Sequence, residues 1–295
     1  MMMLVNPAAG RGGFRNSLGS VLHIFWEGGY QPSVFFSDSS ESIADLIHDH
    51  AQNFPILVCL GGDGTLSNVI SGLMTLPPER RPVLGYIPMG TANDIAATLA
   101  LPRDPIKAAK HILNGEPHPF DVGYINDGDC FAYVAAFGAF TEVSYVTDQN
   151  TKQKLGHLAY VLEALNHLPR LTGFRASVRL DDCEFDGEFV FGGVFNTTSL
   201  GGVLRLNEQL VALGDGLFEV ILVRTPRSAG DLNKIFAGLL TRDYTAIEPA
   251  VIVRQTQNVQ FSFDKSVPWT RDGEKGGDFL SLSLKNCPQA IRIIS

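Results

Sequence analysis

Cysteines and long apolar runs are scarce in this chain of 295 residues. Its four cysteines are widely spaced and form no CxxC pair, which indicates reduced thiols in a cytosolic protein and excludes a disulfide scaffold. No apolar run approaches the roughly 20 residues that span a bilayer. The N-terminus has no charged segment followed by an apolar one, as a signal peptide would have. We therefore expect a soluble, cytoplasmic protein.

Basic residues are also fewer than acidic residues. The chain has 23 Lys and Arg residues against 31 Asp and Glu residues, a net charge of −8. This balance argues against a nucleic-acid partner held by bulk electrostatics and against general polybasic attraction to anionic lipid. By contrast, the 30 glycines suit a protein with several tight loops near a ligand.

Short apolar runs alternate with helical patterns in the first 122 residues. We expect strands at 3–5, 33–36, 56–60 and 83–87, and helices at 16–27, 42–52, 67–74 and 105–114. Asp104 and Pro105 are typical of a helix start, and Gly115 of a helix end. Such alternation predicts a doubly wound, mostly parallel α/β domain.

The pattern changes after residue 122. Short strand-like segments separated by Gly and Asp turns predict an antiparallel β-sandwich, with helices at 155–168 and 229–240. The expected organisation is an α/β domain at 1–122, a hinge near 121–123 and a β domain at 123–285. A last short strand, within residues 286–295, has no partner that the pattern can assign.

Three loops follow strands of the first domain: Asn6–Gly12 (NPAAGRG), Gly61–Thr65 (GGDGT) and Pro88–Ala96 (PMGTANDIA). Since the carboxyl ends of parallel strands meet at one edge of a sheet, these loops should lie side by side. Glycine backbone N–H groups and neutral side chains such as Thr91 can donate to phosphate oxygens. No lysine is present, as a Walker loop would require, and there is no GxGxxG motif.

Two carboxylates in these loops, Asp63 and Asp94, repel phosphate directly but can reach it through Mg²⁺, which prefers oxygen ligands. The loops therefore predict a metal–nucleotide site. Ordinary βα turns remain an alternative for each loop taken alone. A fourth segment, Val267–Gly277, contains Asp272-Gly273-Glu274, which fits a plain hairpin turn or a turn that presents a carboxylate as a proton acceptor.

These motifs together resemble the diacylglycerol kinase catalytic-domain family, which includes bacterial lipid kinases and the sphingosine and ceramide kinases. The resemblance runs from Leu4 to the C-terminus. It implies transfer of the γ-phosphate of ATP, with Mg²⁺, to a lipid hydroxyl, most simply that of diacylglycerol to give phosphatidic acid. It also implies a two-domain fold with nucleotide in the cleft, and a C-terminal segment 286–295 that returns to the first domain.

The resemblance also assigns roles to individual residues. It implies ATP contacts by Asn6, Pro7, Ala8, Ala9, Gly10, Ser37, Gly61, Gly62, Asp63, Gly64, Thr65, Leu66, Ser67 and Thr91. It makes Asp272 the general base and Glu274 its acidic partner. It places a structural Mg²⁺ on the Asp215 side chain, with carbonyls near Ala212 and Leu217, and it arranges Asp63, Asp94 and Asp121 around the nucleotide metal. A type I′ turn at 214–216 is the alternative for Asp215.

The chain departs from the family at Asn68, where a glutamate is usual, and it lacks the usual proline before Gly214. Two competing functions stay open: an NAD kinase, which would have the same ATP loop and a different acceptor, and an ATP-binding sensor without turnover, which Asn68 supports. The acceptor could be diacylglycerol, a sphingoid base, phosphatidylglycerol or a polyprenol. Its apolar trough is expected in the β domain, with 133–140 as one candidate segment. The helix at 155–168 could touch a membrane but more often such a helix is core. Peripheral membrane association follows from the resemblance, and free strand edges could pair two copies into a homodimer.

Overall fold

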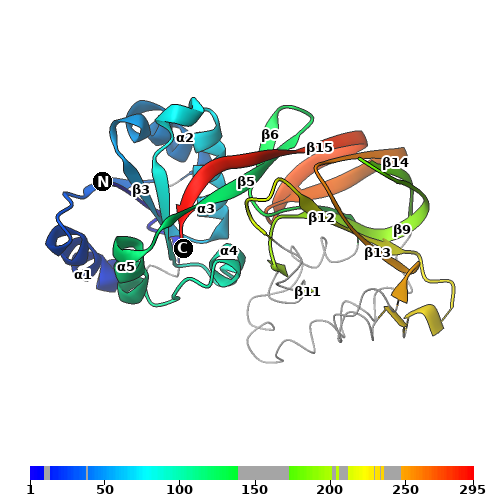
Figure 1. Ribbon diagram of the computed structural model, residues 1–295, viewed down its shortest axis with the longest axis horizontal. Coiled ribbons are helices and arrows are strands. Elements are labelled where there is room, and N and C mark those ends of the chain that lie inside the picture. The colour runs from blue at the N-terminus through cyan, green and yellow to red at the C-terminus, as the bar shows by residue number, and fades with distance from the viewer. Residues whose placement is uncertain are drawn as a thin grey trace. The chain divides into compact units, whose positions relative to one another are not determined.

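The computed structural model describes residues 1–9, 14–37, 39–138, 173–200, 204–205, 212–228, 230–232, 234–235 and 247–295. The chain divides into two compact units (Figure 1). Unit 1 comprises Met1–Val122, Leu213–Asp215 and Cys287–Ser295, and unit 2 comprises Gly123–Ala212 and Gly216–Asn286. Within the described residues, no helix combines the length and the apolar character needed to cross a membrane. The expected helix at 155–168 lies outside the described residues.

A parallel sheet forms the centre of unit 1. Its strands are β1 (Met2–Val5), β2 (Ser33–Phe36), β3 (Ile56–Gly61) and β4 (Val83–Pro88), in the order β4-β3-β1-β2. β1 is buried along its length, and β3 and β4 are buried at all but their first residues. This agrees with the near-continuous apolar runs that a sheet covered on both faces requires.

Helices alternate with these strands. They are α1 (Phe14–Glu27), α2 (Ser40–His50), α3 (Asp63–Met74), α4 (Asp94–Thr98) and α5 (Pro105–Asn114), with single 3₁₀ turns η2 (Ala51–Asn53) and η3 (Pro78–Arg80). Val21 of α1 and Ile112 of α5 share one core cluster with Val58 of β3. α2 packs closely on α3, since a Cβ at Gly72 would lie 2.7 Å from Ile47. The predicted helix starts are close, except that α3 begins within the GGDGT loop and not at residue 67.

Unit 2 is an antiparallel β structure. Its strands are β6 (Asp129–Phe131), β7 (Val134–Gly138), β8 (Phe174–Leu180), β9 (Glu184–Phe195), β10 (Ser199–Leu200), β11 (Leu204–Arg205), β12 (Phe218–Arg224), β13 (Val251–Thr256) and β14 (Asn258–Arg271). Neighbours follow the order β13-β12-β9-β7-β14-β15. β7 and β8 lie end to end between β9 and β14, because each pairs with a different part of those two long strands.

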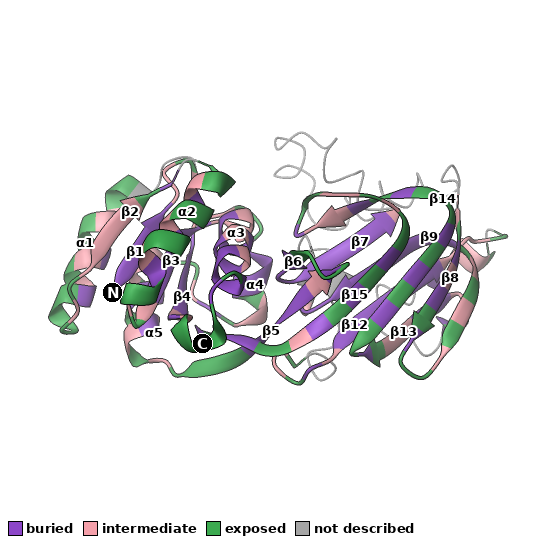
Figure 2. Cartoon of the chain, turned by 90° about the horizontal axis from the view of Figure 1, so that it is seen from above, coloured by how far each residue is buried: buried purple, intermediate pink, exposed green. Residues whose placement is uncertain are grey.

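The core of unit 2 is aromatic. The ring of Phe137 lies 5.0 Å from that of Trp269, 5.1 Å from that of Phe263 and 5.8 Å from that of Phe261. Along β8 and β14, buried and exposed residues largely alternate, as Figure 2 shows. Alternation of this kind is expected where one face of a sheet is buried.

Two strands, β5 (Pro117–Ile125) and β15 (Glu274–Ile294), run from one unit into the other. At the end of β15, Ile293 pairs in parallel with Leu84 of β4, which supplies the partner that the sequence pattern could not assign. Within unit 1, the backbone N–H of Gln289 donates to Asp121 Oδ1 at 2.6 Å. The N–H of Asp121 donates to the Leu213 carbonyl at 2.7 Å, so three distant segments meet there.

Candidate functional site

The carboxyl ends of the four parallel strands bring four loops of unit 1 together. Backbone hydrogen bonds continue past the strand ends, from Ser37 N to Val5 O at 3.0 Å, from Asn6 N to Leu60 O at 3.1 Å and from Met89 N to Gly61 O at 2.7 Å. The three glycine-containing loops that the sequence singled out therefore lie at one edge of the sheet. Ser37 joins them from the loop after β2.

Asn6 connects the loop after β1 to the GGDGT loop after β3. Its Nδ2 donates to Thr65 Oγ1 at 2.9 Å, and its Oδ1 accepts from Ala8 N at 2.9 Å. Thr65 is 6% exposed and lies against Gly61, where a Cβ would be 2.6 Å from the threonine Cβ. This separation is shorter than any ordinary contact, so the loop requires glycine at position 61.

The GGDGT loop after β3 and the loop after β4 are in direct backbone contact. A Cβ at Gly90 would lie 2.8 Å from Gly62 Cα, and a Cβ at Gly62 would lie 3.2 Å from Gly90 Cα. Only two glycines permit this approach without displacing one of the loops. The GGDGT and GTAND motifs are thus one structure, although 27 residues separate Gly62 from Gly90 in the sequence.

Asn93 fixes the conformation of the loop after β4, a role that the sequence did not indicate. Its backbone is left-handed, with φ of 56°, a conformation that asparagine tolerates better than most residues. Its Oδ1 accepts from Gly90 N at 2.8 Å and its Nδ2 donates to Gly90 O at 2.8 Å. Its backbone N–H donates to Asp63 Oδ2 at 2.7 Å. No apolar or glycine pattern signals this role, because it depends on one side chain closing a turn.

Asp63 lies in an environment that disfavours its charge. Burial raises the pKa of this carboxyl to about 6, and repulsion by Asp94 adds to the rise, while N–H groups at the start of α4 oppose it. Asp94 itself is only 4% exposed. Two neighbouring carboxylates in a partly dehydrated loop are better accommodated when a cation lies beside them.

The residues present suit a magnesium–nucleotide complex. In the described part of the chain, Ser37 Oγ and Asp63 Oδ1 are buried and have no hydrogen-bond partner, so both are available to a ligand. No group of three or more acidic, histidine or cysteine side chains forms a metal cluster there. The two carboxylates of Asp63 and Asp94 fit Mg²⁺ bound with nucleotide, which takes one or two carboxylates and completes its shell with waters and phosphate oxygens.

The other residues assigned to ATP have varied surroundings. Leu66 and Ser67 are buried near the start of α3, whereas Ala8 and Thr91 are exposed at loop tips. Pro7, Ala9 and Gly64 are half-buried. Gly10 lies outside the described residues. Asp121 is completely buried and accepts a hydrogen bond from Gln289 N, and the described residues do not bring it into a metal cluster with Asp63 and Asp94.

The proposed base, Asp272, belongs to unit 2. Asp272 and Gly273 connect β14 to β15 with φ of 48° and 82°, as in a type I′ hairpin turn. The hairpin alternative is therefore confirmed, but the Asp272 side chain is only 4% exposed.

Backbone N–H groups surround this carboxylate. Oδ1 accepts from Tyr133 N and Val134 N, each at 3.0 Å, and Oδ2 accepts from Ala132 N at 2.7 Å. These bonds fix the carboxylate in place. Glu274, at the start of β15, is exposed.

The segment proposed to hold a structural metal is partly open to solvent. Asp215 and Ala212 are exposed and Leu217 is half-buried. Gly216 has φ of +84° but Asp215 does not have positive φ. A type I′ turn needs positive φ at both central residues, so that alternative for 214–216 is wrong.

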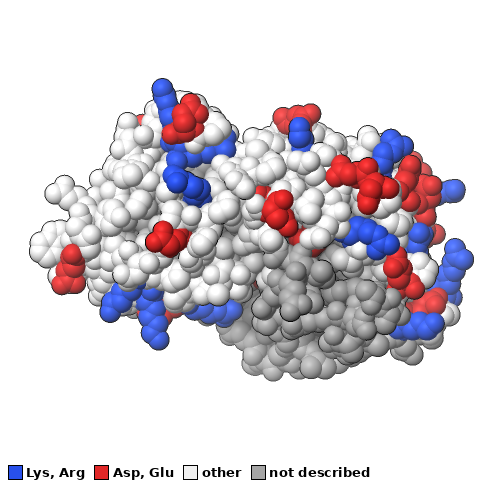
Figure 3. Space-filling model, in the orientation of Figure 1, with Lys and Arg blue, Asp and Glu red and all other residues white. Residues whose placement is uncertain are grey.

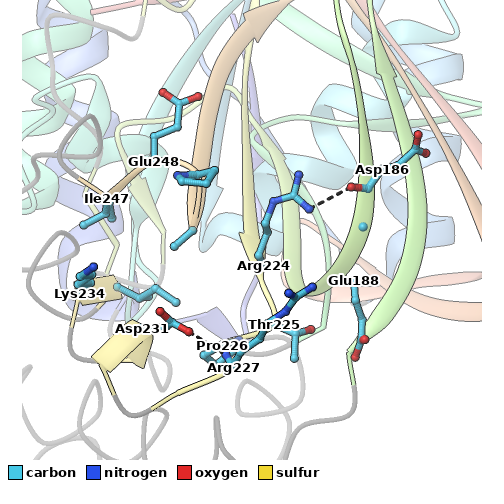
Figure 4. A pocket seen from close by; sticks show the side chains of 14 residues that line it. Asp186, Glu188, Arg224, Thr225, Pro226, Arg227, Asp231, Lys234, Ile247 and Glu248 are labelled. Atoms are coloured by element: carbon cyan, nitrogen blue, oxygen red, sulfur yellow. Dashed lines mark hydrogen bonds between the residues drawn. The ribbon is translucent and has the colours of Figure 1, made fainter.

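Unit 2 also contains a pocket of about 660 Å³ that the sequence did not predict. Its lining includes Arg224, Arg227 and Lys234 together with Asp186, Glu188, Asp231 and Glu248, as Figure 4 shows. Arg224 Nη1 donates to the Asp186 carbonyl at 3.0 Å, and its guanidinium lies 5.1 Å from the Phe189 ring. None of the residues assigned from the sequence lines this pocket.

Comparison with known proteins covers nearly the whole chain. Residues 1–125 match the family described as diacylglycerol kinase catalytic domain, and residues 134–295 match the YegS C-terminal NAD kinase beta sandwich-like domain. The diacylglycerol kinase of Bacillus subtilis is 32% identical over 93% of this chain and 89% of its own length. That of Staphylococcus carnosus is 31% identical over 99% of this chain and 93% of its own.

Solved structures from Bacillus anthracis have the same fold. Two of them cover 99% of this chain, with TM-scores of 0.82 and 0.75 and sequence identities of 23% and 19%. The matched parts make up 94% and 95% of those chains, and the second is the structure of a diacylglycerol kinase. The mixed α/β architecture in two parts, expected from the sequence, is therefore shared with them.

Proposed function

Since this chain belongs to the diacylglycerol kinase catalytic-domain family, we propose that it is an ATP- and Mg²⁺-dependent lipid kinase. It transfers the γ-phosphate of ATP to a lipid hydroxyl, most simply that of diacylglycerol to give phosphatidic acid. The observation that carries the nucleotide part of this proposal is the convergence of four loops on two acidic side chains, with a buried hydroxyl and a carboxylate oxygen still unpartnered.

Unit 1 supplies the donor site in this proposal. Residues 1–122 form the nucleotide-binding domain, and the segment 286–295 returns to it, while 123–285 form the lipid domain. Backbone N–H groups of the glycine loops and the hydroxyls of Ser37 and Thr65 bind the phosphates. Asp63 and Asp94 hold the Mg²⁺. When bound, this ion neutralises charge on the phosphoryl group.

Asp272 supplies the proton acceptor. As the acceptor oxygen bonds to the γ-phosphorus, the bond from that phosphorus to the bridging oxygen of ADP breaks. The hydroxyl proton passes to the Asp272 carboxylate, which the backbone N–H groups of residues 132–134 hold in place. Glu274, in the same turn, contributes negative charge near this carboxylate. Asp215, with carbonyls near Ala212 and Leu217, holds a structural Mg²⁺ apart from the chemistry.

The acceptor is a lipid, so the enzyme works at a membrane surface to which it binds peripherally from the cytoplasm. On the face in Figure 3, basic and acidic side chains of the described residues are interspersed, and no broad basic patch gathers there. Because the net charge is −8, membrane contact is expected to depend on apolar insertion and on the lipid itself, and less on salt-sensitive attraction. The same proposal includes a homodimer, in which two copies of the chain pair through free strand edges.

A panel of acceptors with radiolabelled ATP tests this function. We expect Mg²⁺-dependent labelling of diacylglycerol in mixed micelles, compared in parallel with a sphingoid base, phosphatidylglycerol, a polyprenol and NAD⁺. Labelling of NAD⁺ alone would contradict the lipid kinase function and support an NAD kinase. Binding of Mg–ATP with no labelled product across the panel would instead favour a sensor, for which Asn68 is the supporting feature.

A further inference from the structure

Asn93 lies where the two glycine loops of unit 1 meet, and its side chain is almost completely buried at 5% exposure. Each of its polar groups has a specific partner. The amide oxygen and nitrogen bond to the N–H and carbonyl of the same residue, Gly90, which closes the four-residue turn Gly90–Asn93. A side chain that satisfies both backbone groups of one residue fixes the conformation of the turn between them.

The backbone of Asn93 connects this turn to the neighbouring loop. Its N–H donates to Asp63 Oδ2 at 2.7 Å, and its carbonyl accepts from Ala97 N at 2.9 Å, so it also begins α4. Gly62 and Gly90 are in backbone contact beside it. The Tyr86 hydroxyl, on β4 and fully buried, lies 3.4 Å from Asn93 Oδ1. Displacing Asn93 therefore changes the spacing of both loops.

We infer that Asn93 is a positioning residue for the nucleotide: it sets the distance between the GGDGT loop and the turn that carries Thr91. Thr91 and Ala92 form the exposed tip of that turn. Asn93 itself is not available to a ligand, since its amide is engaged with Gly90. It acts through the loops, and this inference rests on the proposed binding of Mg–ATP to unit 1.

Asn93→Gly is the most informative substitution. Glycine adopts a φ of 56° without strain, so this variant removes the two side-chain bonds and leaves the backbone conformation accessible. Loss of two buried hydrogen bonds should weaken Mg–ATP binding by about tenfold or more, measured by calorimetry. At saturating ATP, kcat should stay within about threefold, because the proton acceptor lies in unit 2 and is not altered.

Asn126→Gly is a matched control in unit 2. Asn126 also has positive φ, of 48°, and its Oδ1 accepts from Ser283 N at 2.9 Å. This control should bind Mg–ATP like the unaltered chain. Tyr86→Phe removes only the long contact to Oδ1 and should weaken binding about twofold at most. Amide hydrogen exchange in residues 61–66 and 89–95 should accelerate in Asn93→Gly and not in Asn126→Gly.

Two results would overturn the inference, and they are distinguishable from each other. If the unaltered chain binds Mg–ATP and Asn93→Gly, still folded by its melting transition, binds it equally well, the positioning role is wrong and the kinase proposal stands. If the unaltered chain binds no Mg–ATP, the proposed function and this inference both fail.

Discussion

The backbone N–H of Ala132 donates a 2.7 Å hydrogen bond to Oδ2 of Asp272, across 140 positions of the chain. The N–H groups of Tyr133 and Val134 donate to its Oδ1. Asp272 therefore forms the turn of one hairpin and also binds the start of the neighbouring strand. In the proposed mechanism, stability and proton transfer therefore depend on the same carboxylate.

Asp272→Asn should lower phosphoryl transfer by at least about 100-fold, because the amide cannot accept the hydroxyl proton. Mg–ATP affinity should stay within about twofold. The free energy of unfolding should fall by about 1–3 kcal/mol, since an amide NH₂ would face a backbone donor. Radiolabel transfer, calorimetry and urea unfolding measure the three effects. Asp278→Asn, which removes an exposed ion pair with Lys275, is the control. Turnover at the unaltered rate would remove Asp272 from the mechanism.

The stability of the nucleotide-free protein should depend on Asp63 between pH 4 and pH 7. Its pKa is raised from 3.8 to about 6 in the folded chain, so its favourable contribution is complete below pH 4 and is lost as the pH rises through 6. Asp63→Asn keeps an acceptor for Asn93 N and should not lose that contribution. Urea unfolding at several pH values should show that the free energy of unfolding of Asp63→Asn rises relative to that of the unaltered chain up to pH 7, by about 3 kcal/mol at most. Parallel curves for the two proteins would contradict this.

Gly90→Ala should separate the GGDGT and GTAND loops. Its Cβ would lie 2.7 Å from Asn93 Oδ1 and 2.8 Å from Gly62 Cα, so the loops must shift. We expect a loss of about 1–3 kcal/mol in the free energy of unfolding and weaker Mg–ATP binding. Gly19→Ala is the control: nothing lies within 4 Å of its Cβ, and in the helix α1 it should stabilise by about 0.5–1 kcal/mol. Equal effects of the two substitutions would refute the close contact.

Magnesium should stabilise the protein even without nucleotide, through Asp215. Millimolar Mg²⁺ should raise the melting temperature of the unaltered chain, because an ion that binds only the folded state favours it. A chelator should reverse the rise. Asp215→Asn should melt at the same temperature with and without the ion. A variant that still responds like its parent would mean that Asp215 holds no metal.

The regular elements of unit 1 were predictable because periodicity and capping are local. The strand at 33–36 is observed at those residues, and Asp104 caps α5 by accepting from Lys107 N at 2.9 Å. The strand bounds at 56–61 and 83–88 differ from the predictions by one residue. The short helix α4 was not expected, since five residues are too few to show a helical period.

The candidate site was predictable only in part. Gly61, Gly62 and Asp63 stood out by composition and by resemblance, and parallel-strand geometry placed them beside Asn6. Asn93 was missed because its role comes from a left-handed backbone and one closed turn, which no pattern in the sequence reveals. Likewise, the sequence allowed Asp272 to be a plain turn residue or a proton acceptor, and it did not reveal the hydrogen bonds from residues 132–134 that hold its carboxylate.

The anchoring of Asp272 has an evolutionary consequence. Three of the groups that hold this carboxylate are main-chain N–H groups, which every residue except proline provides. The side chains at 132–134 can therefore diverge without removing the hydrogen bonds that hold the carboxylate. Under the proposed function, a fold built this way can exchange one alcohol substrate for another over time and keep the same proton acceptor.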